Sequence, residues 1–289
     1  MLNKRSVFIV AFARGGSNIV LNMLRSHPDI CSPVGETQEV FHGKGNAGKI
    51  DQARRRLKYL PIALAENRNV FSMSQWNLRK PFKSSSKKKI DEILFNDRFK
   101  GIVSKDSESF YTNEELKNCR LLCKNLNGLI FTTRNFLDMY PDATFIGIVR
   151  DLRAVCEGHI RRHLYSLEEI SHHCSNAIKQ MLIDEKEIER FHLFRYEDIV
   201  KDPQKALSDI YKACDLPLET VKEIRMETKK VVGHNNSPDG KSLVWYPLDQ
   251  FHKHILPDAN ENQIAKLTDD QRVYIENVCR EEMEHFGYL

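Results

Sequence analysis

The sequence lacks any long apolar run, and this absence excludes two classes of protein. No stretch of the 289 residues approaches the length of a membrane span. The N-terminus also lacks the apolar region of a signal peptide, since the apolar segment at residues 7–12 is too short and a glycine turn follows it at once. We therefore expect no membrane span and no secretory leader.

The cysteines are irregularly spaced. The chain has seven cysteines, an odd number without the spacing of a disulfide framework, which predicts reduced thiols in a cytoplasmic protein. Cys119 and Cys123 lie four positions apart, but no second pair lies nearby to complete a zinc site. We expect no bound metal.

The net charge is also small, because neither sign dominates. The 44 basic and 40 acidic residues leave a net charge of +4, which is too mild to indicate nucleic-acid binding and suits a small polyanionic ligand. Apolar residues make up 41% of the chain and charged residues 29%, which is typical of a soluble domain with a sizeable core.

Strand patterns alternate with helical patterns along most of the chain. This alternation predicts an α/β fold. We expect a single P-loop-like domain over residues 1–289, with a central parallel sheet and helices on both faces. The expected strands are residues 7–12, 121–123, 144–149 and 191–194, and the expected helices are residues 18–26, 50–65, 128–139, 152–164, 167–190, 203–214 and 268–285.

A variable insertion at about residues 40–120 interrupts this alternation. Its lysine-rich run at residues 83–89 is typical of a solvated surface loop, and the alternative is a mobile lid over an acidic acceptor. We expect the acceptor contacts to lie in this insertion.

The turn after the first expected strand has the features of a phosphate site. Gly15 and Gly16 permit a tight turn, Ser17 or Asn18 can cap the next helix, and Arg14 adds a cation with paired donors. A helix N-terminus directs several amides at one spot, which favours an anion. An ordinary βα turn with a surface arginine remains an equal alternative, and no Walker P-loop string occurs in the chain.

A second strand end repeats this arrangement. The buried segment at residues 144–149 ends at Arg150, and a helix opens within the next residues. Arg150 and Arg153 can both reach a second phosphate there, while Asp151 can hold one guanidinium in place. The alternative is that Asp151 only favours the helix dipole and that the arginines are solvated.

Three ordered segments resemble the sulfotransferases that use 3′-phosphoadenosine 5′-phosphosulfate (PAPS). Residues 12–18 look like the 5′-phosphosulfate loop of that family, residues 148–155 look like its 3′-phosphate motif, and residues 195–203 look like its Tyr-Glu-Asp segment. Each motif is weak alone, whereas the ordered set is specific.

The resemblance implies roles for individual residues. It places Arg14, Gly15, Gly16, Ser17 and Asn18 at the 5′-phosphosulfate. It places Arg150 at the 3′-phosphate, and we add Arg153, Tyr196 and Lys241 as further cofactor-binding candidates. The family usually has a serine eight residues after the arginine that corresponds to Arg150, where this chain has Gly158. That contact is lost or comes from Arg153, His159 or the loop at residues 235–241.

Sulfuryl transfer needs fixed cations for the leaving phosphate and a base for the acceptor hydroxyl. Arg14 and Lys124 are the expected cations. Glu36 is the expected base, because the tyrosylprotein branch of the family has a catalytic glutamate in a similar segment and a lysine that matches Lys124. His42 and His27 are the next candidates, although a structural role in a turn suits His27 better.

The acceptor is open at this stage. A carbohydrate hydroxyl is the first expectation, a small-molecule alcohol or phenol the second and a protein tyrosine the third. Trp76, Phe82, Trp245 and Tyr246 are candidates for stacking on an acceptor ring or for core packing. Two other functions remain: a small-molecule kinase, which should carry a Walker lysine, and a non-catalytic binding protein of the same fold.

Overall fold

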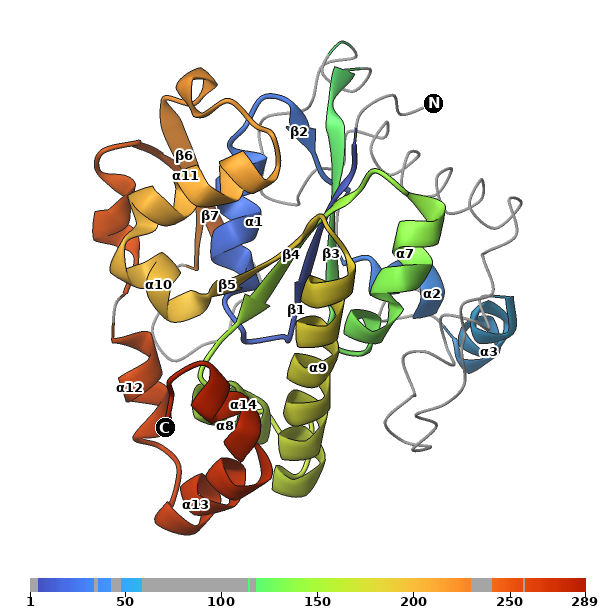
Figure 1. Ribbon diagram of the computed structural model, residues 1–289, viewed down its shortest axis with the longest axis vertical. Helices are drawn as coiled ribbons and strands as arrows, with labels where there is room; N and C mark the ends of the chain where they lie inside the picture. The colour runs from blue at the N-terminus through green and yellow to red at the C-terminus, as the bar shows by residue number, and fades with distance from the viewer. Residues whose placement is uncertain are drawn as a thin grey trace.

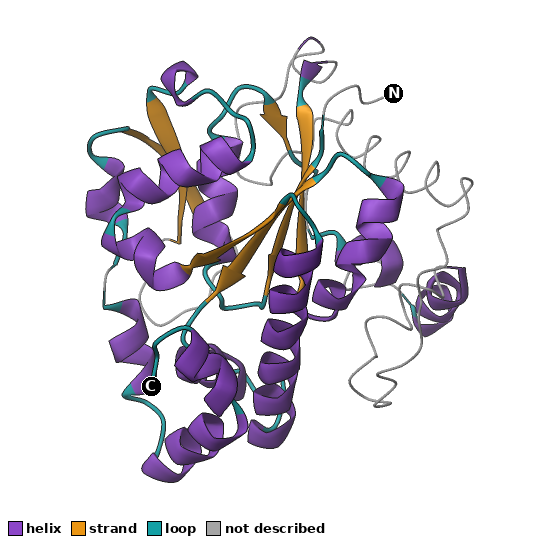
Figure 2. Cartoon of the chain, viewed as in Figure 1, coloured by secondary structure: helices purple, strands orange, loops and turns teal. Residues whose placement is uncertain are grey.

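A computed structural model describes residues 5–33, 36–42, 48–58, 114, 118–229, 241–256 and 258–289 of the chain. Strands and helices alternate along the sequence and surround one central sheet (Figures 1 and 2). The strands are β1 (Val7–Ala11), β2 (Ile30–Cys31), β3 (Arg120–Leu126), β4 (Thr144–Val149), β5 (Phe191–Arg195), β6 (Glu223–Lys229) and β7 (Lys241–Pro247). The α-helices are α1 (Ser17–Arg25), α2 (Gln38–His42), α3 (Lys49–Lys58), α7 (Thr133–Met139), α8 (Leu152–Ile160), α9 (Leu167–Glu187), α10 (Tyr196–Lys201), α11 (Pro203–Ala213), α12 (Ala259–Ile264), α13 (Asp269–Val278) and α14 (Arg280–His285), and the 3-10 helices are η1 (Asn127–Thr132), η2 (Leu218–Thr220) and η3 (Phe251–His254).

The central sheet has the strand order β2-β3-β1-β4-β5, and all its pairs are parallel. The middle strand β1 is completely buried, which explains its unbroken apolar sequence. Because parallel strands end at the same edge, the loops that follow the five strands meet at one side of the sheet. The predicted parallel α/β fold is confirmed.

Two apolar cores cover the two faces of the sheet. Alternate residues of β1 enter different cores: Phe8 and Val10 pack with α7, α8, α9, α13 and α14, while Val7 and Ile9 pack with α1, α10, α11 and β6. This alternation follows from the two-residue period of a strand. Helices on both faces of the sheet, as the sequence predicted, are therefore confirmed.

The local structure differs from the sequence predictions in several places. The expected helix at 128–139 is the 3-10 helix η1 followed by α7, and the expected last helix is divided at Cys279 into α13 and α14. The antiparallel pair of β6 and β7 was not predicted. Ile224 and Met226 are the buried apolar residues among the described side chains of β6, and such a short alternation is a weak signal. Among the described residues, no helix is long and apolar enough to span a membrane.

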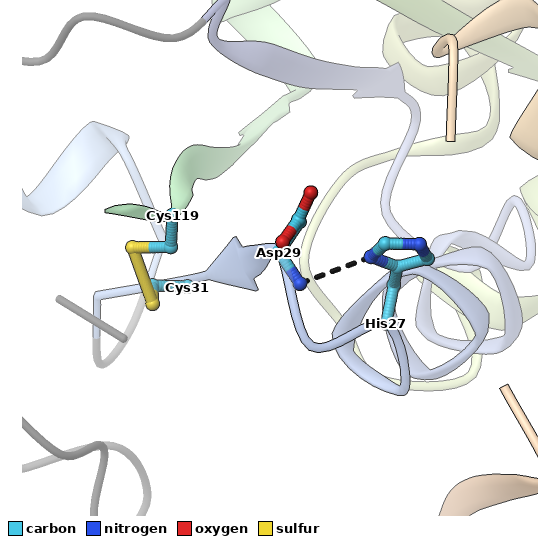
Figure 3. Close-up of a disulfide and its surroundings, with 4 residues drawn as sticks. All are labelled: His27, Asp29, Cys31 and Cys119. Atoms are coloured by element: carbon cyan, nitrogen blue, oxygen red, sulfur yellow. Dashed lines mark hydrogen bonds between the residues drawn. A yellow bond between two sulfur atoms is a disulfide. The ribbon is translucent and has the colours of Figure 1, made fainter. Parts of the chain in front are cut away.

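A disulfide joins Cys31 and Cys119, whose Cα atoms are 5.8 Å apart (Figure 3). It connects the end of β2 to the residue before β3, next to the turn in which the backbone amide of Asp29 donates to Nδ1 of His27. The prediction of reduced thiols is therefore wrong for these two cysteines, because sequence spacing does not reveal which cysteines two neighbouring strands bring together. The other five cysteines are buried and take no part in this bridge. Since the cytoplasmic location was inferred from reduced thiols, it stays a prediction.

Reduction of this disulfide is expected to destabilise the protein. The bridge closes a loop of 88 residues, and such a crosslink typically contributes about 2–4 kcal/mol to the free energy of unfolding. We expect a lower thermal midpoint in reductant for the wild type and no reductant effect for the Cys31→Ser/Cys119→Ser double variant. An intact mass that does not change on reduction would contradict the bridge itself.

Candidate active site

The loop between β1 and α1 presents the start of a helix without a side-chain cap. The N-cap residue is Gly16, in a left-handed conformation with φ of 88°, and it makes no side-chain capping bond to the helix start. The prediction that Ser17 or Asn18 caps α1 is therefore wrong, since both lie inside the helix. The first amides of a helix have no acceptor within the helix. This uncapped end is suited to bind an anion.

Gly16 also allows the loop to contact the start of α10. A Cβ atom at this position would lie 2.2 Å from Cδ2 of Tyr196, and the positive φ disfavours any other residue. Tyr196 is buried, and its burial raises the pKa of the phenol. Tyr196 therefore lies directly behind the loop, as a packing partner of the predicted phosphate site.

Side chains from three other elements hold the backbone of this loop. The amide of Ala13 donates to Oδ1 of Asn127 at 2.8 Å, and its carbonyl accepts from Nε2 of His159 at 2.9 Å. Burial lowers the pKa of His159, which favours the neutral imidazole that makes this bond. The carbonyl of Arg14 accepts from Nη1 of Arg150 at 2.7 Å. The loop is therefore fixed before any ligand binds.

Arg150 lies at the end of β4 with two of its three guanidinium nitrogens occupied. Its Nε donates to Oδ1 of Asn260 at 2.6 Å and its Nη1 donates to Arg14. The guanidinium carbon lies 4.4 Å from the ring centroid of Tyr196. Within the part of the chain that the structure describes, the buried Nη2 has no hydrogen-bond partner. Burial lowers the pKa of Arg150, while Glu197 and Asp151 oppose this shift. This nitrogen can therefore donate to a ligand, and its charge suits an anion.

Gly158 makes room for Arg14. A Cβ atom at this position would lie 3.0 Å from Cγ of Arg14 and 3.2 Å from its Cβ. Arg14 itself adopts a positive φ of 71°, which is uncommon for a residue with a side chain. Glycine at position 158, where the family usually has serine, thus leaves room for the Arg14 side chain to pass across α8.

Arg153 has protein partners around its whole guanidinium. It donates to Asp151 through Nε at 3.1 Å and Nη2 at 2.7 Å, to Glu276 at 2.8 Å and to the carbonyl of Tyr288 at 3.0 Å. The hydrogen bond to Asp151 raises the pKa of Arg153. Asp151 also caps α8 by accepting from the backbone amide of Arg153. This arrangement ties α8 to α13, and a role of Arg153 in phosphate binding stays a prediction.

The structure brings Glu36, Lys124 and Asn18 together. Nζ of Lys124 lies 3.2 Å from Oε1 of Glu36 and donates to Oδ1 of Asn18 at 3.0 Å. The other carboxylate oxygen of Glu36 accepts from Gln38 at 2.6 Å. The Glu36 side chain is 31% exposed and that of Lys124 12% exposed, so both remain within reach of a ligand. The predicted carboxylate and lysine are therefore neighbours beside α1.

Several residues that the sequence predicted for the site either lie outside the described part of the chain or have other contacts. Lys241 begins β7, but its side chain is not among those that the structure describes, and the same holds for the side chain of His42. Trp76, Phe82 and the lysine run at 83–89 lie outside the described residues. Trp245 is 43% exposed on β7, and the ring of Tyr246 stacks on His254 at 3.6 Å. His27 accepts from Asp29 and contacts Pro217, which agrees with a structural role.

Three residues of the site were not proposed from the sequence. Asn127 holds the loop, and Asn260 holds Arg150. Glu197 accepts hydrogen bonds from Asp151, Asn260 and Tyr288. Asn127 has a positive φ of 54°, a conformation that asparagine tolerates, but this is not visible in a sequence. Asn260 lies 110 positions from Arg150. In the described ranges, no group of three or more histidine, cysteine or acidic side chains is arranged to hold a metal ion.

Comparisons with known proteins give a family from the sequence and a shared fold from the structure. A sequence model of the sulfotransferase family matches residues 6–220. The structure is similar to the sulfotransferase domain of the olefin synthase of Synechococcus PCC 7002, with a TM-score of 0.50, 16% identity and 95% of each chain covered. It is also similar to a sulfotransferase domain from the curacin biosynthetic pathway, with a TM-score of 0.50, 15% identity and coverage of 96% of this chain and 98% of that domain. The search among curated proteins found no match. At these identities the structural matches support the fold.

Proposed function

The chain belongs to the sulfotransferase family, and we propose that it transfers a sulfuryl group from PAPS to an acceptor hydroxyl. The observation that supports the proposal is a pair of neighbouring groups that can bind anions, at the ends of β1 and β4. One is the uncapped start of α1 with Arg14, and the other is the unpartnered Nη2 of Arg150. PAPS carries phosphate groups at two positions of its ribose, and two such sites suit it.

The binding roles follow from the groups that the site leaves available. The helix start at Ser17 and Asn18, together with Arg14, would hold the 5′-phosphosulfate, and Arg150 would hold the 3′-phosphate. Tyr196 supports both sites, because it packs against Gly16 and under the guanidinium of Arg150. Arg153 and Lys241 are second-rank candidates for the same ligand.

In this proposal PAPS supplies an activated sulfuryl group, and the protein's own residues perform three tasks. Glu36 accepts the proton of the acceptor hydroxyl, which makes the oxygen a better nucleophile. Lys124 and Arg14 stabilise the negative charge that builds on the leaving phosphate as the group passes in line. Lys124 also orients Glu36 through their ion pair. No metal is needed for these tasks, because arginine, lysine and helix amides provide the positive charge.

The acceptor is proposed as a carbohydrate or a small-molecule alcohol. An alcohol keeps its proton at neutral pH and needs a base such as Glu36 before it can attack, and a phenol of ordinary pKa needs one as well, so Glu36 is compatible with either acceptor. A fold does not determine the acceptor. The segments expected to contact it, within about residues 40–120, lie mostly outside the described residues.

Calorimetric titration with adenosine 3′,5′-bisphosphate tests the donor part of the proposal. This compound has both phosphate positions of the desulfated donor, so we expect it to bind, and we expect ATP, which lacks a 3′-phosphate, not to bind. Binding of the bisphosphate would justify a screen of alcohols and sugars with PAPS. Absence of binding at millimolar concentration would overturn the proposal, and tight ATP binding would favour a kinase.

A further inference from the structure

Asn260 on α12 uses both ends of its amide within the site. Its Oδ1 accepts from Nε of Arg150 at 2.6 Å, and its Nδ2 donates to Oε1 of Glu197 at 2.5 Å. Arginine can only donate and an ionised glutamate can only accept, so this side chain fits in a single orientation. Asn260 is buried, which makes exchange of these partners for water costly.

Glu197 fixes Asn260 from behind. Its Oε1 also accepts from the backbone amide of Asp151 at 3.0 Å, and its Oε2 accepts from the hydroxyl of Tyr288 at 2.7 Å. One carboxylate therefore joins the start of α8, helix α12 and the segment after α14. Tyr288 is positioned in turn by its carbonyl, which accepts from Arg153, and by its ring, which lies 5.0 Å from the guanidinium carbon of Arg195.

This chain of contacts restricts Arg150. An arginine side chain loses considerable rotamer freedom when it is fixed, and a guanidinium that is oriented beforehand loses less on binding. Nε is held by Asn260, Nη1 by the Arg14 carbonyl, and the flat face by Tyr196. Only Nη2 is left with no partner among the described residues.

We propose that Asn260 is a positioning residue for phosphate recognition: with Glu197 and Tyr288 behind it, it orients Arg150 so that Nη2 is directed to the 3′-phosphate. The inference rests on the proposed function, since it concerns how Arg150 recognises that group. Asn260 acts only through Arg150, and it touches neither the acceptor nor the transferred group. The last helices of the chain thereby determine the selectivity of a site that lies at the ends of β1 and β4.

The experiment compares two ligands that differ by one phosphate. The dissociation constants of adenosine 3′,5′-bisphosphate and adenosine 5′-monophosphate are measured by calorimetry for each variant, and their ratio reports what the 3′-phosphate contributes. For Asn260→Ala we expect this ratio to fall about tenfold or more, while the affinity for the monophosphate stays nearly constant. Asn262→Ala is the matched control, because Asn262 is an exposed asparagine on the same helix.

A second variant keeps the test decisive if Asn260→Ala does not fold. Tyr288→Phe removes only the hydroxyl that contacts Glu197, and we expect a smaller decrease of the same ratio, about threefold. Equal weakening of both ligands would indicate a general structural role and would overturn the inference, as would wild-type ratios in both variants. If the wild-type protein itself does not bind the bisphosphate, the proposed function fails and the inference fails with it.

Discussion

Replacement of Glu36 by glutamine is expected to lower kcat for an alcohol acceptor about 100- to 10,000-fold, the range that a positioned general base contributes. Glutamine keeps the size of the side chain and its possible contacts with Gln38 and Lys124, but it cannot take a proton. The affinity for adenosine 3′,5′-bisphosphate should change little, because Glu36 lies on the acceptor side of Lys124 in the proposed mechanism. Turnover is measured with PAPS and the best alcohol from the acceptor screen.

The choice of acceptor distinguishes a base from a structural carboxylate. A phenol that is already ionised at the assay pH has no proton to lose, so Glu36→Gln should slow its sulfation far less than that of an alcohol. Equal losses for both acceptors would contradict the role of Glu36 as the base. Glu189→Gln is the matched control, because Glu189 is exposed just before β5, at the opposite end of the sheet, and should leave both rates unchanged.

Replacement of Arg150 by glutamine is expected to weaken binding of adenosine 3′,5′-bisphosphate about 10- to 100-fold. A hydrogen bond to a charged group typically contributes about 1.5–3 kcal/mol, and each 1.4 kcal/mol corresponds to a factor of ten in affinity. Arg150 is only 6% exposed, so water cannot replace it easily at the ligand. Calorimetry measures the effect, with adenosine 5′-monophosphate as the ligand whose affinity should change least.

Loss of charge alone does not explain the expected effect of Arg150→Gln. Arg162→Gln removes the same charge from an exposed residue two positions beyond the end of α8, and it should bind the bisphosphate like the wild type. If Arg162→Gln weakened binding as much as Arg150→Gln, the long-range potential of the protein would account for binding instead of a built site. Circular dichroism of each variant verifies that the fold is retained.

Much of the fold was predictable, because its signals are local. A buried parallel strand must be apolar on both faces, and residues 7–12 and 144–149 show this directly. A strand followed by glycines and then by a helical pattern also predicts the loop that is the first candidate phosphate site. The break at Cys279 within the helical pattern at 268–285 and the β6–β7 pair were harder to predict, since short elements depend on tertiary contacts that outweigh local preference.

Individual residues of the candidate site were predictable only where they belong to a recognisable motif. Arg14, Gly16 and Arg150 lie in motifs at strand ends, and the structure places them next to one another through the bond from Arg150 to the Arg14 carbonyl. The predicted Ser17 or Asn18 cap was wrong, because sequence preference for a capping side chain does not reveal that Gly16 occupies the cap. An uncapped helix start is visible only in three dimensions.

The sequence by itself determined most of the strands and helices and the identity of the loop residues, because these depend on neighbours a few positions apart, and it indicated the family through the order of three separate motifs. The tertiary structure decided the contacts between distant segments. It brought Lys124 to Glu36, Asn260 to Arg150 across 110 positions, and Cys31 to Cys119 across 88. Such pairs depend on which strands become neighbours in the sheet and which helices cover it. A sequence pattern of period two or 3.6 shows which residues share a face of one element, but it does not show which elements become neighbours.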